Sequence, residues 1–174
     1  MRILTLVALT GLLLLTGCNQ AQRYQTAEQV AADSTVEKDP YKAVVWTRTP
    51  HIYARPIGFF FRHFETKYGS EKYQLYINFM SSDWVFFDQA YDSDGRRLDF
   101  VKIDRDVRYG GSVKEAFAIN FPRSYLEEKA KGDGLNIKFV GKRGEQILLL
   151  RPIWVEGFLM KVDNPDADFS GAGD

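Results

Sequence analysis

KYQLYINFM, residues 72–80, is the stretch that decides the fold of this chain. Its more apolar side chains recur at every second position: Tyr73, Leu75, Ile77 and Phe79. The positions between them hold Lys72, Gln74, Tyr76 and Asn78. Successive side chains of a strand point to opposite faces, so this period of two gives one buried and one wetter face. The stretch therefore predicts a half-buried β-strand.

The same period occurs twice more along the chain. Residues 113–121 carry apolar side chains at alternating positions: Val113, Phe117, Ile119 and Phe121. Residues 135–139 repeat the pattern with Leu135, Ile137 and Phe139. Both stretches predict strands of the same kind.

Turn sequences separate the predicted strands and join them in pairs. The turns are residues 68–71 between strands over 53–66 and 72–80, residues 92–95 between 84–91 and 97–103, and residues 141–144 between 135–140 and 145–150. Asp94-Gly95 suits a tight hairpin, because glycine accepts the positive φ that such turns need. Three hairpins in succession predict an antiparallel sheet.

Two short helices interrupt these strands. Ser124 and Glu127 have capping-box spacing, which predicts a helix over residues 125–131 that ends at Gly132. A second helix begins after Pro152, with an apolar face of Trp154, Val155, Phe158, Leu159 and Val162. The predicted fold class is mainly β, at the margin of α+β: a single antiparallel β-sandwich of seven or eight strands with two short helices.

The chain divides into four parts on composition. Residues 1–17 are a signal peptide, residues 18–40 a flexible tether with a short turn of helix at its centre, residues 41–162 the β-sandwich domain, and residues 163–174 an acidic, disordered tail. Only thirteen residues, Ile3 to Leu15, form the apolar run of the signal. A spanning helix needs about 20 apolar residues, so this run is a signal core and not a permanent membrane span.

Leu15-Thr16-Gly17-Cys18 resembles the lipobox of bacterial lipoprotein precursors. The resemblance implies that Cys18 receives diacylglycerol and further acyl chains, and that cleavage falls between Gly17 and Cys18. Asn19 follows the cysteine where an aspartate commonly retains such proteins at the inner membrane. The expected address is therefore the outer membrane, facing the periplasm. Cys18 is also the only cysteine, so no intramolecular disulfide is possible.

Composition narrows the choice of partner. The 23 basic and 23 acidic side chains give a formal net charge of zero, so no overall field attracts nucleic acid. The 13 Phe, nine Tyr and three Trp suit a sandwich core, and some of them could line a groove for a sugar, peptide or acyl chain.

Few residues suggest a specific site. One basic cluster, a candidate patch for phosphate-bearing lipid, lipopolysaccharide or an acidic partner, consists of Lys129, Lys131, Lys138, Lys142 and Arg143. His51 and His63 are the only histidines, and they lack the spacing of a metal site. We find no nucleophile motif or phosphate loop, and we expect no catalytic residue, no metal and no cofactor.

The predicted function is binding. The chain is expected to be a lipid-anchored envelope protein that acts as an adaptor, binding or inhibitor module on another envelope protein, and exposed strand edges could take part by pairing with a partner strand. One alternative is a carrier that holds an acyl chain or other small apolar ligand between its sheets. A further alternative is an envelope hydrolase that uses paired carboxylates, such as Asp83 with Asp88 or Asp104 with Asp106.

Overall fold

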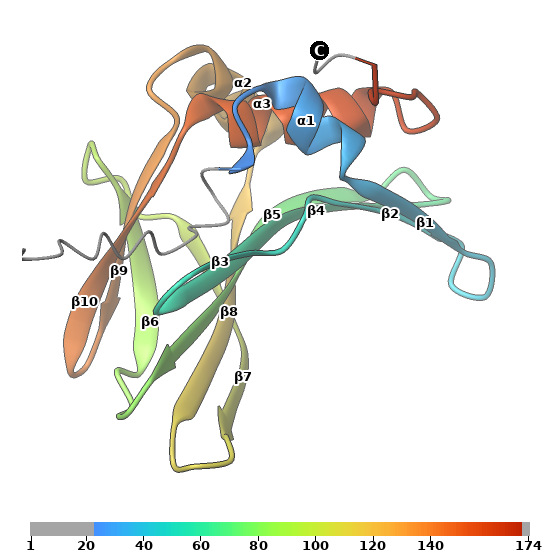
Figure 1. Ribbon diagram of the computed structural model, residues 1–174. Helices are drawn as coiled ribbons and strands as arrows, with labels where there is room; N and C mark the ends of the chain where they lie inside the picture. The colour runs from blue at the N-terminus through green and yellow to red at the C-terminus, as the bar shows by residue number, and fades with distance from the viewer. Residues whose placement is uncertain (1–22, 172–174) are drawn as a thin grey trace, which may run out of the picture.

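The computed structural model describes residues 23–171 (Figure 1). Gly17, Cys18 and the predicted signal peptide lie outside the described residues. The described residues form three helices and ten strands, and the helices are α1 (Ala27–Ala32), α2 (Arg123–Lys131) and α3 (Pro152–Asp163). The ten strands are β1 (Thr35–Asp39), β2 (Val44–Arg48), β3 (Ile52–Ala54), β4 (Ile57–Thr66), β5 (Glu71–Ser81), β6 (Phe87–Asp92), β7 (Asp99–Val107), β8 (Val113–Phe121), β9 (Leu135–Gly141) and β10 (Gly144–Leu150).

The strands form two antiparallel sheets. The large sheet has seven strands in the order β1-β2-β4-β5-β8-β7, with β3 paired to β4. The small sheet has the order β10-β9-β6. The predicted fold class, a mainly β, sandwich-like fold with antiparallel sheets and short helices, is confirmed. The strand count exceeds the expected seven or eight because β1, β2 and the short β3 extend the large sheet.

The core lies on one face of the large sheet and has two kinds of cover. At one end the small sheet packs against it: the ring of Phe87 meets Phe79 at a centroid distance of 4.9 Å, and the ring of Phe139 meets Phe117 at 5.0 Å. At the other end α3 covers the same face, where Phe158 stacks on Phe61 at 5.2 Å. The large sheet is therefore covered by a second sheet at one end and by a helix at the other.

The N-terminal segment is part of the folded body. Residues 18–40 were predicted to be a flexible tether, and residues 23–40 of that range are described. Val30 and Ala31 of α1 are fully buried, and β1 pairs with β2 along its length. A capping box between Thr26 and Gln29 begins α1. Gly157 of α3 allows the close approach, because a β-carbon there would collide with the backbone of α1. Residues 24–39 therefore belong to the folded body and not to a flexible tether.

The turn at residues 92–95 closes only a short hairpin, in which the backbone N–H of Asp92 bonds the Arg96 carbonyl oxygen and that of Leu98 bonds the Ala90 carbonyl oxygen. β6 pairs with β9 in the small sheet and β7 pairs with β8 in the large one, apart from an isolated bridge between Tyr91 and Arg97. The buried carboxylate of Asp92 holds the turn, because it accepts hydrogen bonds from the backbone N–H groups of Asp94 and Arg96 and from the Tyr125 hydroxyl. This anchored turn carries the chain from one sheet to the other. The other two predicted hairpins, β4–β5 and β9–β10, form as expected.

Neither α2 nor α3 begins with a side-chain cap. α2 starts at Arg123 after Pro122, and no side chain caps it. The predicted capping box of Ser124 and Glu127 is wrong, because the Glu127 carboxylate bonds the Arg123 guanidinium at 2.7 Å instead. Arg123 also reaches Asp163 at 2.8 Å, which ties α2 to α3. Among residues 23–171, no helix is both long and apolar enough to cross a bilayer.

Part of the predicted tail is held against α3. The Lys161 ammonium donates to the carbonyl oxygen of Ala167 at 3.0 Å and lies 5.5 Å from the centre of the Phe169 ring. Residues 164–171 thus turn back along the helix end, whereas residues 172–174 lie outside the described residues.

Candidate functional site

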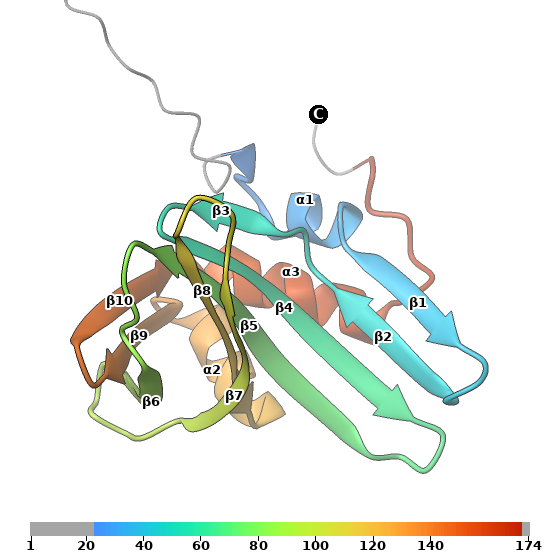
Figure 2. The same cartoon turned by 90° about the horizontal axis from the view of Figure 1, so that it is seen from below.

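The second face of the large sheet is covered by no described helix or strand. Figure 2 shows its strands in front of α2 and α3. Strand register assigns the side chains, because β4 positions alternate between buried Phe59 or Phe61 and half-buried Phe60 or Arg62. We call this surface the open face and define it by Trp46, Tyr53, Phe60, Arg62, Phe64, Gln74, Tyr76, Asn78 and Met80.

Aromatic rings run in a continuous row across the open face. Phe60 and Tyr76 are cross-strand partners that stack at a centroid distance of 4.8 Å with an interplanar angle of 20°. The row continues in one direction through His51, whose ring lies 5.4 Å from Phe60 and 4.3 Å from Tyr53. Such rings offer a large apolar contact area at low entropic cost, because each has only two side-chain torsions.

Arg62 extends the row in the other direction. Its guanidinium carbon lies 4.9 Å from the centre of the Tyr76 ring and 5.8 Å from that of Trp46. The Nε–H group donates to the side-chain oxygen of Gln74 at 2.8 Å, which fixes the plane of the guanidinium. Burial lowers the pKa of Arg62, although an arginine keeps its charge at any physiological pH. The open face thus places a held positive charge between aromatic rings.

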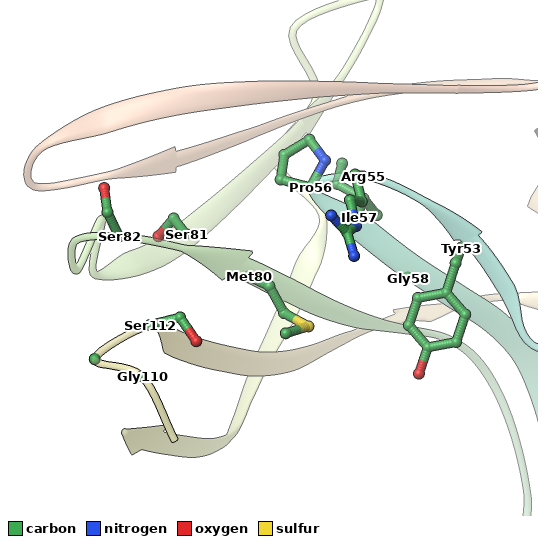
Figure 3. A pocket seen from close by; sticks show the side chains of 11 residues that line it. Tyr53, Arg55, Pro56, Ile57, Gly58, Met80, Ser81, Ser82, Gly110 and Ser112 are labelled. Atoms are coloured by element: carbon green, nitrogen blue, oxygen red, sulfur yellow. The ribbon is translucent and has the colours of Figure 1, made fainter. Parts of the chain in front are cut away.

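A groove of about 740 Å³ adjoins this row (Figure 3). Its walls come from the β3–β4 turn, the end of β5 and the turn between β7 and β8. The lining residues are Tyr53, Arg55, Pro56, Ile57, Gly58, Met80, Ser81, Ser82, Gly110, Gly111 and Ser112. Figure 3 shows the Met80 side chain between the Tyr53 ring and the turn that carries Ser112. Tyr53 and Met80 belong to both surfaces, so the groove is a continuation of the open face.

Gly58 is what allows Tyr53 to lie flat at the junction. A β-carbon at Gly58 would stand 3.0 and 3.1 Å from two carbons of the Tyr53 ring and 3.1 Å from Nε2 of His51. The ring therefore covers bare backbone, an arrangement that shields glycine in strands. Burial lowers the pKa of His51, and the nearby Lys114 ammonium lowers it further, so His51 is neutral at pH 7.

Asn78 adds a polar group to the same region. It pairs with Gly58 on β4 and with Ala116 on β8, both of which leave its side chain room. Its Oδ1 atom is buried and has no hydrogen-bond partner among the described residues. An unsatisfied buried acceptor of this kind is uncommon in proteins.

A buried carboxylate holds the loop beyond the groove. Glu115, 2% exposed, accepts hydrogen bonds from three successive backbone N–H groups, those of Val85, Phe86 and Phe87, at 2.7 to 3.1 Å. Arg105 pairs with the same carboxylate at 3.1 Å. Phe86 has a positive φ of 63°, which non-glycine residues rarely adopt. Every oxygen of Glu115 is thus engaged internally, and the group is structural.

A second polar cluster joins the sheet to α2. The Tyr73 hydroxyl donates to Glu71 at 2.9 Å and receives a bond from Arg123 at 3.3 Å, while His63 lies 3.4 Å from the same Glu71 oxygen. Burial lowers the pKa of His63, and the contact with Glu71 opposes part of that shift. These groups pair with one another, and the cluster stabilises the junction. Among the described residues, no group of three or more His, Cys, Asp or Glu side chains could hold a metal ion.

The predicted basic cluster is spread over both ends of one hairpin. Lys129 and Lys131 lie in the last turn of α2, close to the start of β9, whereas Lys142 and Arg143 lie in the β9–β10 turn at its far end (Figure 1). β9 has seven residues, which at about 3.3 Å each separates the two groups by roughly 20 Å. Lys138 lies between them and pairs with Glu145 at 2.9 Å. The five residues do not form one compact patch.

The candidate carboxylates are dispersed. Asp104 and Asp106 lie on the exposed strand β7, where Asp106 pairs with Arg108 at 3.3 Å. Asp83 is exposed in the loop after β5, and its side chain accepts a bond from the hydroxyl of Ser82. None of these three lines the groove, which has no acidic residue in its lining.

Comparison with known proteins finds no significant match: no protein family, no curated protein and no solved structure is similar to this chain. The chemistry of the open face and of the groove is therefore the basis for assigning a function. Sequence patterns did not single out this surface, because Phe60 and Phe64 lie in a mostly apolar stretch, residues 57–64, that is typical of core residues. The signal that points to it is Tyr76, an aromatic residue in the wetter set of the strand over residues 72–80.

Proposed function

We propose that this protein is a lipid-anchored component of the bacterial cell envelope that binds another envelope protein through the open face and its groove. It would act as a binding, adaptor or inhibitor module and not as an enzyme. The observation that carries the proposal is the row of rings from Tyr53 through Phe60 and Tyr76 to Trp46, with Arg62 held among them. Tyrosine, tryptophan and arginine are the residues most enriched at energetic hot spots of protein interfaces.

The lipid anchor is the second element of the proposal. The lipobox-like sequence at residues 15–18 supports acylation of Cys18, and Asn19 supports transfer to the outer membrane with the domain facing the periplasm. The several acyl chains of such an anchor make attachment effectively permanent, so the domain samples only partners near one surface.

Packing gives less support to the carrier alternative. An acyl carrier of the predicted kind needs a cavity between its two sheets. That space contains Phe79, Phe87, Phe117 and Phe139, which are at most 7% exposed and touch one another ring to ring. A hydrolase that uses paired carboxylates is supported less still, because the groove is lined by no acidic side chain.

Cross-linking in intact envelopes tests the proposal. A photoreactive amino acid in place of Tyr76 should form one dominant adduct with another envelope protein, and the same group in place of Tyr68, which is 84% exposed on the β4–β5 turn, should not. Co-purification with a variant provides the second arm. Phe60→Ala should reduce the amount of that partner protein recovered with the acylated chain at least tenfold. Equal adducts from both positions, or recovery that is insensitive to Phe60→Ala, would contradict the proposal.

A further inference from the structure

The anchor would stand very close to the folded body. Tyr24 is the first firmly docked residue: it is 5% exposed, its hydroxyl donates to Asp33 at 2.7 Å, and its ring meets that of Trp154 edge-on at 5.0 Å. Only five residues separate it from Cys18. Because an extended chain spans at most about 3.6 Å per residue, the body cannot stand more than roughly 20 Å from an anchor at Cys18. Some part of its surface must then face the lipid headgroups at close range.

The position of Tyr24 identifies which surfaces of the body lie near the proposed anchor at Cys18. Its carbonyl oxygen accepts a hydrogen bond from the guanidinium of Arg151, the residue that follows β10. The end of β10, with Leu149 two residues before Arg151, therefore lies beside the end of the tether. The other neighbouring surface is the helical layer, where Glu28, Asp33 and Glu156 are mixed with the basic side chains of Arg23, Lys129, Lys131 and Lys161.

The β9–β10 hairpin presents an apolar and basic outer surface. Leu148 and Leu150 point into the core, whereas Ile147 is 51% exposed and Leu149 is 70% exposed. Glu145 is the only acidic residue in β9, β10 and their turn, and Lys138 pairs with it at 2.9 Å. Figure 1 shows β10 along the outer edge of the molecule. We call this surface the hairpin face and define it by Lys138, Lys142, Arg143, Ile147 and Leu149.

We propose that the hairpin face rests on the anionic surface of the membrane that holds the lipid anchor. This inference rests on the proposed acylation of Cys18. Exposed aliphatic side chains beside lysine and arginine are the combination that binds the interface of a bilayer, since the aliphatic groups enter the headgroup boundary while the cations meet anionic lipids. The helical layer, the other surface within reach, mixes acidic and basic side chains and therefore offers no net attraction to the same lipids. The small sheet that carries the hairpin packs on the core face of the large sheet, so the open face is the opposite face of that sheet and stays free for a partner.

Site-specific quenching in vesicles tests the inference with the full acylated chain. Cys18 would carry a thioether, so a cysteine introduced by Leu149→Cys is the only free thiol and can be labelled with a fluorophore. The protein is reconstituted into vesicles of phosphatidylethanolamine and phosphatidylglycerol that contain a lipid with a nitroxide near its headgroup. Tyr68→Cys is the matched control, because Tyr68 is exposed on the β4–β5 turn and this turn lies at the opposite side of the molecule from β10 (Figure 2).

We expect quenching at Leu149→Cys to exceed that at Tyr68→Cys several-fold, and to fall when phosphatidylcholine replaces phosphatidylglycerol. Ile147→Cys should behave like Leu149→Cys, which guards against a local disturbance at one position. Equal quenching at positions 149 and 68 would overturn the inference, as would a label that is shielded from water but not quenched by the lipid, because a protein would then cover the face. Labelling of the wild-type chain at Cys18 would instead overturn the proposed anchor itself, so the two failures are distinguishable.

Discussion

The ring of Tyr53 lies against the backbone of Gly58, with two ring carbons at 3.0 and 3.1 Å from the point where a β-carbon would stand. Gly58→Ala must therefore displace the ring and disturb the junction of groove and open face. Overpacking of this kind costs about 1–3 kcal/mol of stability, and partner binding should weaken with it. Urea unfolding measures the loss of stability. Gly144→Ala, where a β-carbon meets only Val85 at 3.7 Å, is the control and should change stability by less than about 0.5 kcal/mol.

Glu115→Gln should be strongly destabilising. The substitution removes the charge that pairs with Arg105 and half of the acceptor capacity that serves three backbone N–H groups. Breaking a buried ion pair from one side costs about 3–5 kcal/mol, and the partial exposure of Arg105 places the expected loss near the lower end. Asp106→Asn breaks an exposed pair and should cost about 0–1 kcal/mol. Similar unfolding midpoints for the two variants would contradict the structural role of Glu115.

Stability should fall as the solution becomes mildly acidic. Burial lowers the pKa of His63 in the folded protein, whereas in the unfolded chain it titrates near its ordinary value of about 6.5. The unfolded state therefore binds the proton first, and stability is lost as pH falls below about 6.5. His63→Gln should flatten the dependence of the unfolding free energy on pH between about 7 and 5. His51→Gln should leave the part due to His63 in place, so an unchanged slope in His63→Gln would refute this assignment.

Val30→Ala tests whether the N-terminal segment belongs to the core. Val30 is fully buried between α1 and α3, so the smaller side chain should leave a cavity and cost about 2 kcal/mol. Val107→Ala is the matched control, because Val107 is 63% exposed and its truncation should change stability by less than about 0.5 kcal/mol. If residues 23–39 were a loose tether, both variants would unfold at the same denaturant concentration as the wild type.

Cys18→Ala should abolish membrane attachment. The variant lacks the thiol that forms the thioether, so the body should move from the membrane pellet to the supernatant after gentle lysis. Mass spectrometry of the wild-type amino terminus provides the direct measurement of the acyl chains. Thr16→Ser keeps a small residue before the cysteine and should fractionate as the wild type does. Retention of Cys18→Ala in the membrane would show that another feature holds the protein there.

Local patterns predicted the parts of the fold that depend on local interactions. The alternation at residues 72–80 and the turn at Gly69 are sufficient for the β4–β5 hairpin, because both strands and their connection are adjacent in sequence. Partner choice for β6 and β7 depends instead on long-range contacts, such as those of the Phe87 ring with Phe117 and Phe139. The side-chain pattern of each strand is compatible with both sheets. The sequence therefore favoured pairing of β6 with β7, the next strand along the chain.

The open face could not be predicted from the sequence, because it too depends on long-range strand pairing. Phe60 and Phe64 lie in an almost continuous apolar run, IGFFFRHF, that shows no alternation from which two faces could be told apart. Only the pairing of β4 with β2 and β5 determines which side each ring occupies. The burial of α1 was equally hidden, because six residues are too few for a clear helical period and the space for them depends on Gly157.

The docking of Tyr24 on Trp154 also limits where the molecule can be cut. A truncation at residue 41, which composition alone would recommend as a domain boundary, discards Tyr24, Val30 and the edge strand β1, and it uncovers Trp154. If Cys18 carries the proposed anchor, a protease that releases an intact body would have only the bonds between Cys18 and Tyr24 to attack. Cleavage further along the chain would release a body that lacks part of its core, so shedding and loss of the native fold would coincide.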